Sequence, residues 1–136
     1  MYRRFLPILL LSLIALLSAC SAPAPDQTAT GQNQLINPAA YVDQFGADTT
    51  FSRHFLVDVR TPEEFASGHI AGAVNIPVEE LSAHLSEFPT DRPTVVYCRS
   101  GNRSATAASQ LAASGYDVYD LGGIIDWSAA GFPMTQ

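Results

Sequence analysis

Residues 94–114 read TVVYCRSGNRSATAASQLAAS. Residues 94–97 are β-branched or aromatic, which is typical of a buried strand. Residues 103–114 are rich in alanine and predict a helix, which Gly115 ends. Cys98 lies between the two, at the start of a short loop. The pattern therefore places a cysteine at the carboxyl end of a strand, where open parallel sheets bind their ligands.

The loop that begins at Cys98 is suited to an anion. A tight loop that opens a helix directs backbone N–H groups inward, and the helix dipole adds partial positive charge. Gly101 and Asn102 tolerate the backbone angles that such a turn requires. These donors and two nearby arginines favour the thiolate, so Cys98 is predicted to be a nucleophile at neutral pH. The predicted substrate loop is Arg99, Ser100, Gly101, Asn102 and Arg103.

Strand and helix patterns alternate along the rest of the chain, which predicts parallel βαβ units. Residues 55–59 form a nearly continuous apolar run, typical of a strand buried on both faces. Thr61 and Pro62 predict the start of a helix that ends at Gly68. The fold class is thus α/β, with a parallel sheet of about five strands and helices on both faces. Further strands are expected at 35–36, 73–76 and 117–121, further helices at 38–45, 78–85 and 124–130, and a turn at Gly122-Gly123.

Residues 1–19 have the features of an export signal peptide. Two arginines precede an apolar run from 5 to 17, which is too short to span a bilayer. The ending LSAC at residues 17–20 resembles the lipobox of bacterial lipoproteins, in which the cysteine receives lipid. An uncleaved membrane anchor, or an ordinary signal cut elsewhere, is the alternative.

Lipidation of Cys20 would make residues 20–34 a membrane tether, because this stretch has no apolar periodicity. The folded domain would then be residues 35–136. Two acyl chains are sufficient for stable attachment to a membrane. Ser21, the second mature residue, resembles the pattern sorted to the outer membrane in a Gram-negative host. The expected location is therefore the bacterial cell envelope, facing the periplasm.

Charge and cysteine content disfavour several classes of partner. Without the signal peptide, five arginines face 13 acidic residues, and the net charge of −8 disfavours nucleic acid. Cys98 would be the only thiol once Cys20 is lipidated, so no internal disulfide is expected. His54 and His84 are predicted to face solvent, and His69 to form a structural hydrogen bond. These histidines suggest no metal site.

Several further motifs accompany the Cys98 loop. They are DVR at 58–60, EEF at 63–65, GHI at 68–70, GA at 72–73, NIP at 75–77, and Gly122, Gly123, Trp127, Gly131 and Pro133 near the end. Together with the loop, they resemble a rhodanese domain over nearly all of residues 35–136. The resemblance implies a rhodanese-like fold and sulfurtransfer through a persulfide on Cys98, without a cofactor.

The resemblance also implies the substrates. A sulfane sulfur donor such as thiosulfate would load Cys98, and a thiol or cyanide would accept the sulfur. The loop amides would stabilise the persulfide, Arg103 would fix the loop and its charge, and Arg99 would steer the donor. We expect the domain to be a monomer.

Asp58 and Arg60 are predicted to support the active loop rather than to take part in the chemistry. Asp58 ends a buried strand, so its charge needs a partner, for which Arg60 or backbone amides are candidates. An ion pair between Arg60 and Glu64 is the structural alternative. Trp127 is expected in the core.

Two other functions stay open. One is a binding or sensing module, in which Cys98 receives sulfur from a partner without turnover. The other is a phosphatase or an arsenate reductase, which the loop length disfavours. Four residues separate Cys98 from Arg103, whereas cysteine phosphatases and their rhodanese-like relatives use Cys-x5-Arg. A second cysteine to resolve a disulfide would also be missing once Cys20 is lipidated.

Overall fold

A computed structural model describes residues 31–46, 48 and 50–136. The predicted signal peptide, Cys20 and most of the predicted tether lie outside the described residues. Five parallel strands form one sheet in the order β1-β5-β4-β2-β3, so the predicted sheet is confirmed. The strands are β1 (Asn33–Leu35), β2 (Phe55–Asp58), β3 (Val74–Asn75), β4 (Thr94–Cys98) and β5 (Val118–Gly123).

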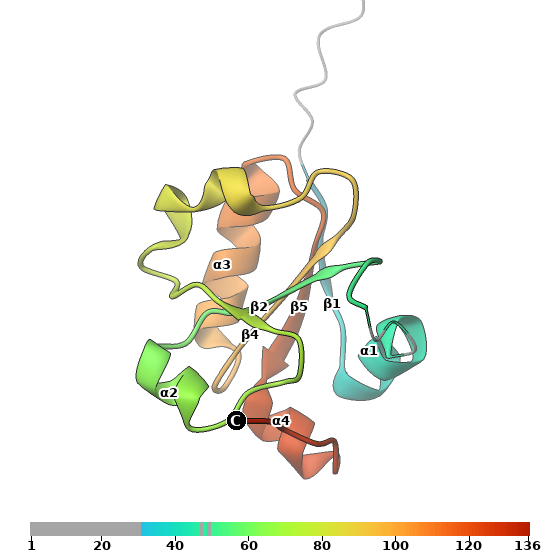
Figure 1. The fold of residues 1–136 in the computed structure, drawn as a ribbon. Helices are drawn as coiled ribbons and strands as arrows, with labels where there is room; N and C mark the ends of the chain where they lie inside the picture. Colours follow the sequence, from blue (N-terminus) through green and yellow to red (C-terminus); the bar gives the residue numbers. More distant parts are fainter. Residues whose placement is uncertain (1–30, 47, 49) are drawn as a thin grey trace, which may run out of the picture.

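Helices cover both faces of the sheet, as predicted (Figure 1). One face packs against α3, and the other packs against α1 and α4. Among the described residues, no helix is both long and apolar enough to span a membrane. The α-helices are α1 (Pro38–Phe45), α2 (Pro62–Ala66), α3 (Asn102–Ala113) and α4 (Ile124–Ala129).

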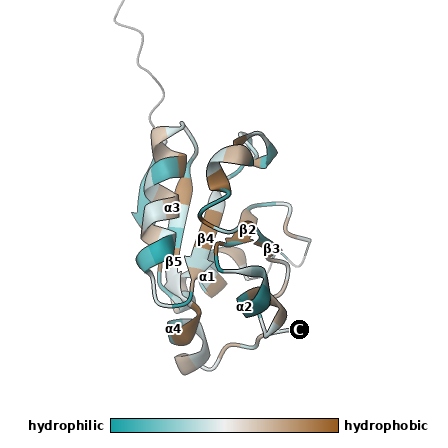
Figure 2. Cartoon of the chain, turned by 90° about the vertical axis from the view of Figure 1, so that its left-hand side faces the viewer, coloured by the Kyte–Doolittle hydropathy of each residue, from teal (hydrophilic) through white to brown (hydrophobic). Residues whose placement is uncertain are grey.

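The central strand β4 is buried along its whole length. Its side chains alternate between two cores, because successive residues of a strand point to opposite faces. Val96 and Cys98 belong to the core under α3, whereas Val95 and Tyr97 belong to the core under α1 and α4. Figure 2 shows hydrophobic residues gathered on the strands beneath α3, while much of the outward side of α3 is hydrophilic.

The helix predicted at 78–85 is wrong. Two short 3-10 helices, η1 (Leu81–Ala83) and η2 (Leu85–Glu87), take its place. Here the buried side chain of Leu81 anchors the segment, and the Tyr116 hydroxyl donates to the carbonyl of Leu85 at 2.6 Å. These contacts favour the tighter turns.

The strand boundaries also differ from the prediction, with the largest differences in β1 and β5. β1 begins at Asn33, inside the stretch predicted as tether, because Asn33 pairs with Val118 on β5. Gly122-Gly123 is not a turn. Both glycines belong to β5, with Gly123 paired to Cys98, and α4 follows directly.

Candidate active site

Cys98 is the last residue of β4, and its side chain is buried below the loop that follows. The backbone N–H of Gly101 donates to Cys98 Sγ at 3.0 Å. Gly101 adopts φ +99°, a left-handed conformation that an L side chain rarely accepts. The turn at Gly101 thus places a backbone N–H donor against the Cys98 sulfur. The helix α3 begins at Asn102, one residue earlier than predicted.

The loop packs against β5 at Gly123, a position that only glycine fits. A Cβ atom at Gly123 would lie 2.7 Å from the Arg99 carbonyl oxygen and 2.9 Å from Ser100 Cα. The N–H of Ile125 also donates to the Arg99 carbonyl at 3.3 Å. The sequence shows the glycine pair, but its spacing alone does not reveal that it makes room for the loop.

Ser104 is a site residue that the sequence reasoning missed. It lies in the first turn of α3, is fully buried, and places its Oγ 3.7 Å from Cys98 Sγ. The Ser104 hydroxyl donates to the Gly101 carbonyl at 2.9 Å and lies 3.3 Å from the Gly122 carbonyl. A hydroxyl directly after Cys-x4-Arg is the available sequence signal, although a serine in a first helical turn is common.

Arg103 does not extend freely into the loop, because its guanidinium is engaged with Glu64 on α2. Two hydrogen bonds join the groups, at 2.7 and 2.9 Å. Glu64 also completes the capping box of α2 with Thr61. The hydrogen bonds from Arg103 lower the pKa of Glu64 to about 2, and those with Glu64 raise the pKa of Arg103. This pair ties the start of α3 to the start of α2.

The remaining loop side chains point outward. Arg99, Ser100 and Asn102 are exposed, whereas Gly101 and Arg103 are half-buried. Arg99 is therefore open to solvent, and its role in steering the donor stays a prediction.

Asp58 and Arg60 form a buried ion pair beneath the same end of the sheet. Arg60 donates through Nε and Nη2 to both carboxylate oxygens of Asp58, with the shortest contact at 2.6 Å. Arg60 also donates to the Gly68 carbonyl at 2.7 Å. Burial lowers the pKa of Arg60, but its hydrogen bonds and charge interaction with Asp58 outweigh this and raise it overall. The predicted partner of Asp58 is confirmed, and the Arg60–Glu64 ion pair is wrong because Glu64 pairs with Arg103.

The three histidines are placed differently from one another. His54, predicted to face solvent, is buried, and its Nε2 lies 2.9 Å from the hydroxyl of Tyr41. Desolvation lowers the pKa of His54. His69 Nδ1 bonds the Phe65 carbonyl at 3.0 Å, as predicted, and His84 is partly exposed. Within the described ranges, no group of three metal-binding side chains comes together.

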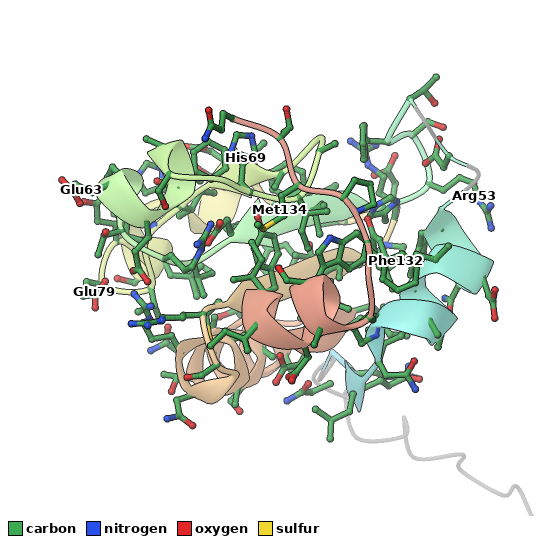
Figure 3. All side chains as sticks on the ribbon, turned by 90° about the horizontal axis from the view of Figure 1, so that it is seen from below. Arg53, Glu63, His69, Glu79, Phe132 and Met134 are labelled. Carbon is green, nitrogen blue, oxygen red and sulfur yellow. The ribbon has the colours of Figure 1, made fainter. Side chains whose placement is uncertain are left out.

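The C-terminal segment crosses the end of the sheet that carries the loop. Figure 3 views this end and shows the segment running from α4 past Phe132 and Met134 toward His69. His69 and Thr135 exchange two backbone hydrogen bonds, at 2.9 and 2.8 Å. Trp127 is buried, as expected, and donates to the Pro133 carbonyl at 3.0 Å. The segment is therefore fixed across this end of the sheet by its contacts with His69 and Trp127.

These contacts define a class of site: a single thiol at the carboxyl end of a parallel strand, with a backbone donor on its sulfur and a helix starting behind it. Such a site can hold negative charge on sulfur without a metal. The comparisons with known proteins identify the family. A sequence model of the rhodanese-like domain matches residues 39–130, and the chain belongs to this family.

Individual relatives agree with this assignment. A sulfurtransferase of Allochromatium vinosum is 47% identical over 82 residues, which are 59% of this chain and 77% of that protein. The thiosulfate sulfurtransferase GlpE of Ectopseudomonas mendocina is 38% identical over 79 residues, 57% of this chain and 72% of that protein. The crystal structure of a rhodanese-related protein from Thermoplasma volcanium superposes with a TM-score of 0.67 and 32% identity, covering 75% of this chain and 97% of that one.

Proposed function

We propose that the chain is a thiosulfate-type sulfurtransferase that carries sulfane sulfur as a persulfide on Cys98. The observation that carries this proposal is the Gly101 N–H, which points at Cys98 Sγ from 3.0 Å in a loop of only four intervening residues. Family membership and the relatives named as sulfurtransferases support the same reaction type.

The first half-reaction loads the cysteine. The Cys98 thiolate attacks the outer sulfur of thiosulfate, a new S–S bond forms, and the S–S bond of thiosulfate breaks. Sulfite leaves with two negative charges, and the persulfide keeps one on its outer sulfur, so charge is balanced. Arg99 is exposed beside the loop and supplies local positive charge to a dianion approaching an acidic protein.

The second half-reaction returns the cysteine to its starting state. A thiolate or cyanide attacks the outer sulfur, and the electron pair of the broken S–S bond returns to Cys98 Sγ. The products are the acceptor's persulfide or thiocyanate and the Cys98 thiolate. Because the residue Cys98 is only 1% exposed, the outer sulfur is the atom better placed to meet an acceptor.

Mass spectrometry tests the proposal directly. The intact protein is incubated with thiosulfate, and the mass of Cys98 is expected to rise by one sulfur atom and to return after cyanide is added. Cys98→Ser should neither gain sulfur nor form thiocyanate. An unchanged mass with every sulfane donor tried would refute the proposal. Loading without repeated turnover in the presence of both thiol and cyanide would instead support the non-turnover sensing module.

We also propose that Cys20 carries lipid and holds the domain in the bacterial cell envelope. The support is the LSAC ending after the apolar run of residues 5–17. In a bacterial host, the full chain should incorporate a labelled fatty acid and sediment with membranes, and Cys20→Ala should do neither. Label retained by Cys20→Ala would refute this assignment.

A further inference from the structure

Ser104 presents a buried hydroxyl that the reaction above leaves unused. It is fully buried in the first turn of α3, directly beneath the active loop. Its Oγ lies 3.7 Å from Cys98 Sγ, the atom that forms and breaks bonds. A buried hydroxyl needs a partner in every state of the site, because an unpaired polar group in the interior is costly.

The Ser104 hydroxyl has one proton to donate and several possible acceptors nearby. The carbonyl oxygens of Gly101 and Gly122 lie 2.9 and 3.3 Å from Ser104 Oγ. When Cys98 is a thiol, its S–H can donate to Ser104 Oγ while the Ser104 proton goes to Gly101. When Cys98 is a thiolate, the sulfur becomes an acceptor and the S–H donor disappears. A rotation about the Cβ–Oγ axis of Ser104 is then enough to turn its proton onto the sulfur.

We propose that Ser104 is a catalytic residue whose hydroxyl changes its hydrogen-bond partner with the charge on Cys98. In the thiolate it donates to Sγ, beside the Gly101 N–H that already does so at 3.0 Å. In the thiol and in the persulfide, where Sγ carries no charge, it donates to the Gly101 carbonyl. The part of this proposal that concerns sulfur transfer rests on the proposed function.

The main consequence falls on the discharge of the persulfide. When the acceptor attacks the outer sulfur, negative charge develops on Sγ, which is the leaving atom. A donor that turns onto Sγ at that moment stabilises the transition state more than the persulfide. Loading starts from a thiolate that Ser104 already stabilises, so removal of the hydroxyl should slow loading less than discharge at a pH where the thiolate is fully formed.

Two measurements on the full chain test the proposal. The first is the rate of Cys98 alkylation by iodoacetamide across pH, followed by mass. In Ser104→Ala, the midpoint of this profile should move about one unit to higher pH, the effect of losing one charge-assisted hydrogen bond. The second is discharge of the preformed persulfide by cyanide, which should slow about tenfold. Ser109→Ala removes an exposed hydroxyl of the same helix, bonded to the Ala105 carbonyl at 2.9 Å, and should match the wild type in both.

A second pair of variants covers the case in which Ser104→Ala does not fold. Ser104→Thr and Ser104→Val have the same shape and differ in the hydroxyl, so only Ser104→Thr should keep the lower midpoint and the faster discharge. Equal profiles and equal discharge rates for variants with and without the hydroxyl would overturn the proposal. The alkylation profile needs no sulfur donor, so a failure of the proposed function, with no donor loading Cys98, is distinguishable from a failure of the Ser104 proposal.

Discussion

Two arginine–carboxylate pairs brace the active end of the sheet, and they differ in burial. In the Arg60–Asp58 pair, the side chains are 6% and 0% exposed, whereas in the Arg103–Glu64 pair they are 31% and 29% exposed. A buried pair that loses one partner leaves an uncompensated charge, which costs several times more than the loss of a pair near the surface. We infer that Arg60–Asp58 mainly maintains the fold and Arg103–Glu64 mainly maintains the loop.

The largest effect on stability is expected when one partner of the buried pair is removed and the other is left in place. Arg60→Met leaves Asp58 charged and buried, and should lower the free energy of unfolding by about 3–5 kcal/mol. Urea unfolding followed by circular dichroism measures this change. Arg53→Met removes an exposed arginine and should change stability by less than about 0.5 kcal/mol. Equal losses in the two variants would show that breaking the buried pair costs no more stability than removing an exposed arginine.

Removing both charges should be less harmful than removing one. The double variant Asp58→Asn with Arg60→Met leaves no buried charge, so it should recover about half of the stability that Arg60→Met loses. The same urea measurement, on the two single variants and the double variant, gives the coupling between the residues. If the losses of the two single variants added up in the double variant, the ion pair would not account for the stability lost in Arg60→Met.

Breaking the outer pair should change activity more than stability. Arg103→Met frees the start of α3 from α2, and we expect the rate of persulfide formation to fall about tenfold. Its free energy of unfolding should fall by no more than about 1 kcal/mol. Arg103→Lys keeps the charge but not the two-pronged geometry, so it should recover activity only in part. If Arg103→Met formed the persulfide at the wild-type rate, Arg103 would have no role in the active loop.

The smallest effect is a pH dependence at Glu64. Its pKa falls from an ordinary value of 4.5 to about 2 on folding, so the pair stabilises the protein fully above pH 4.5 and the stabilisation is lost as the pH falls toward 2. Glu64→Gln should therefore be about 1 kcal/mol less stable than wild type at pH 7, a value reduced by partial exposure. This difference should vanish near pH 2, as measured by urea unfolding. Asp43→Asn, an exposed control on α1, should show no such trend.

The sequence predicts the structure well where interactions among residues close along the chain determine the local conformation. The apolar run of β4, the alanine-rich α3 and the Thr61 cap of α2 all form as predicted, because strand burial, helix propensity and capping act over a few residues. The position of Cys98 at a strand end follows from the same reasoning. The segment 78–85 shows the limit, since the tertiary contacts of Leu81 and Leu85 select 3-10 turns there.

By itself, the sequence determined the α/β class, the parallel sheet, the family resemblance and the position of Cys98 at the end of a strand. Only the tertiary structure decided which charges meet, because Glu64 and Arg103 are distant along the chain and pair through the docking of two helices. It also decided the roles of Gly123 and Ser104, which depend on the close approach of β5 and α3 to the loop. Contacts of this kind arise from packing between elements, and no periodicity within a single element encodes them.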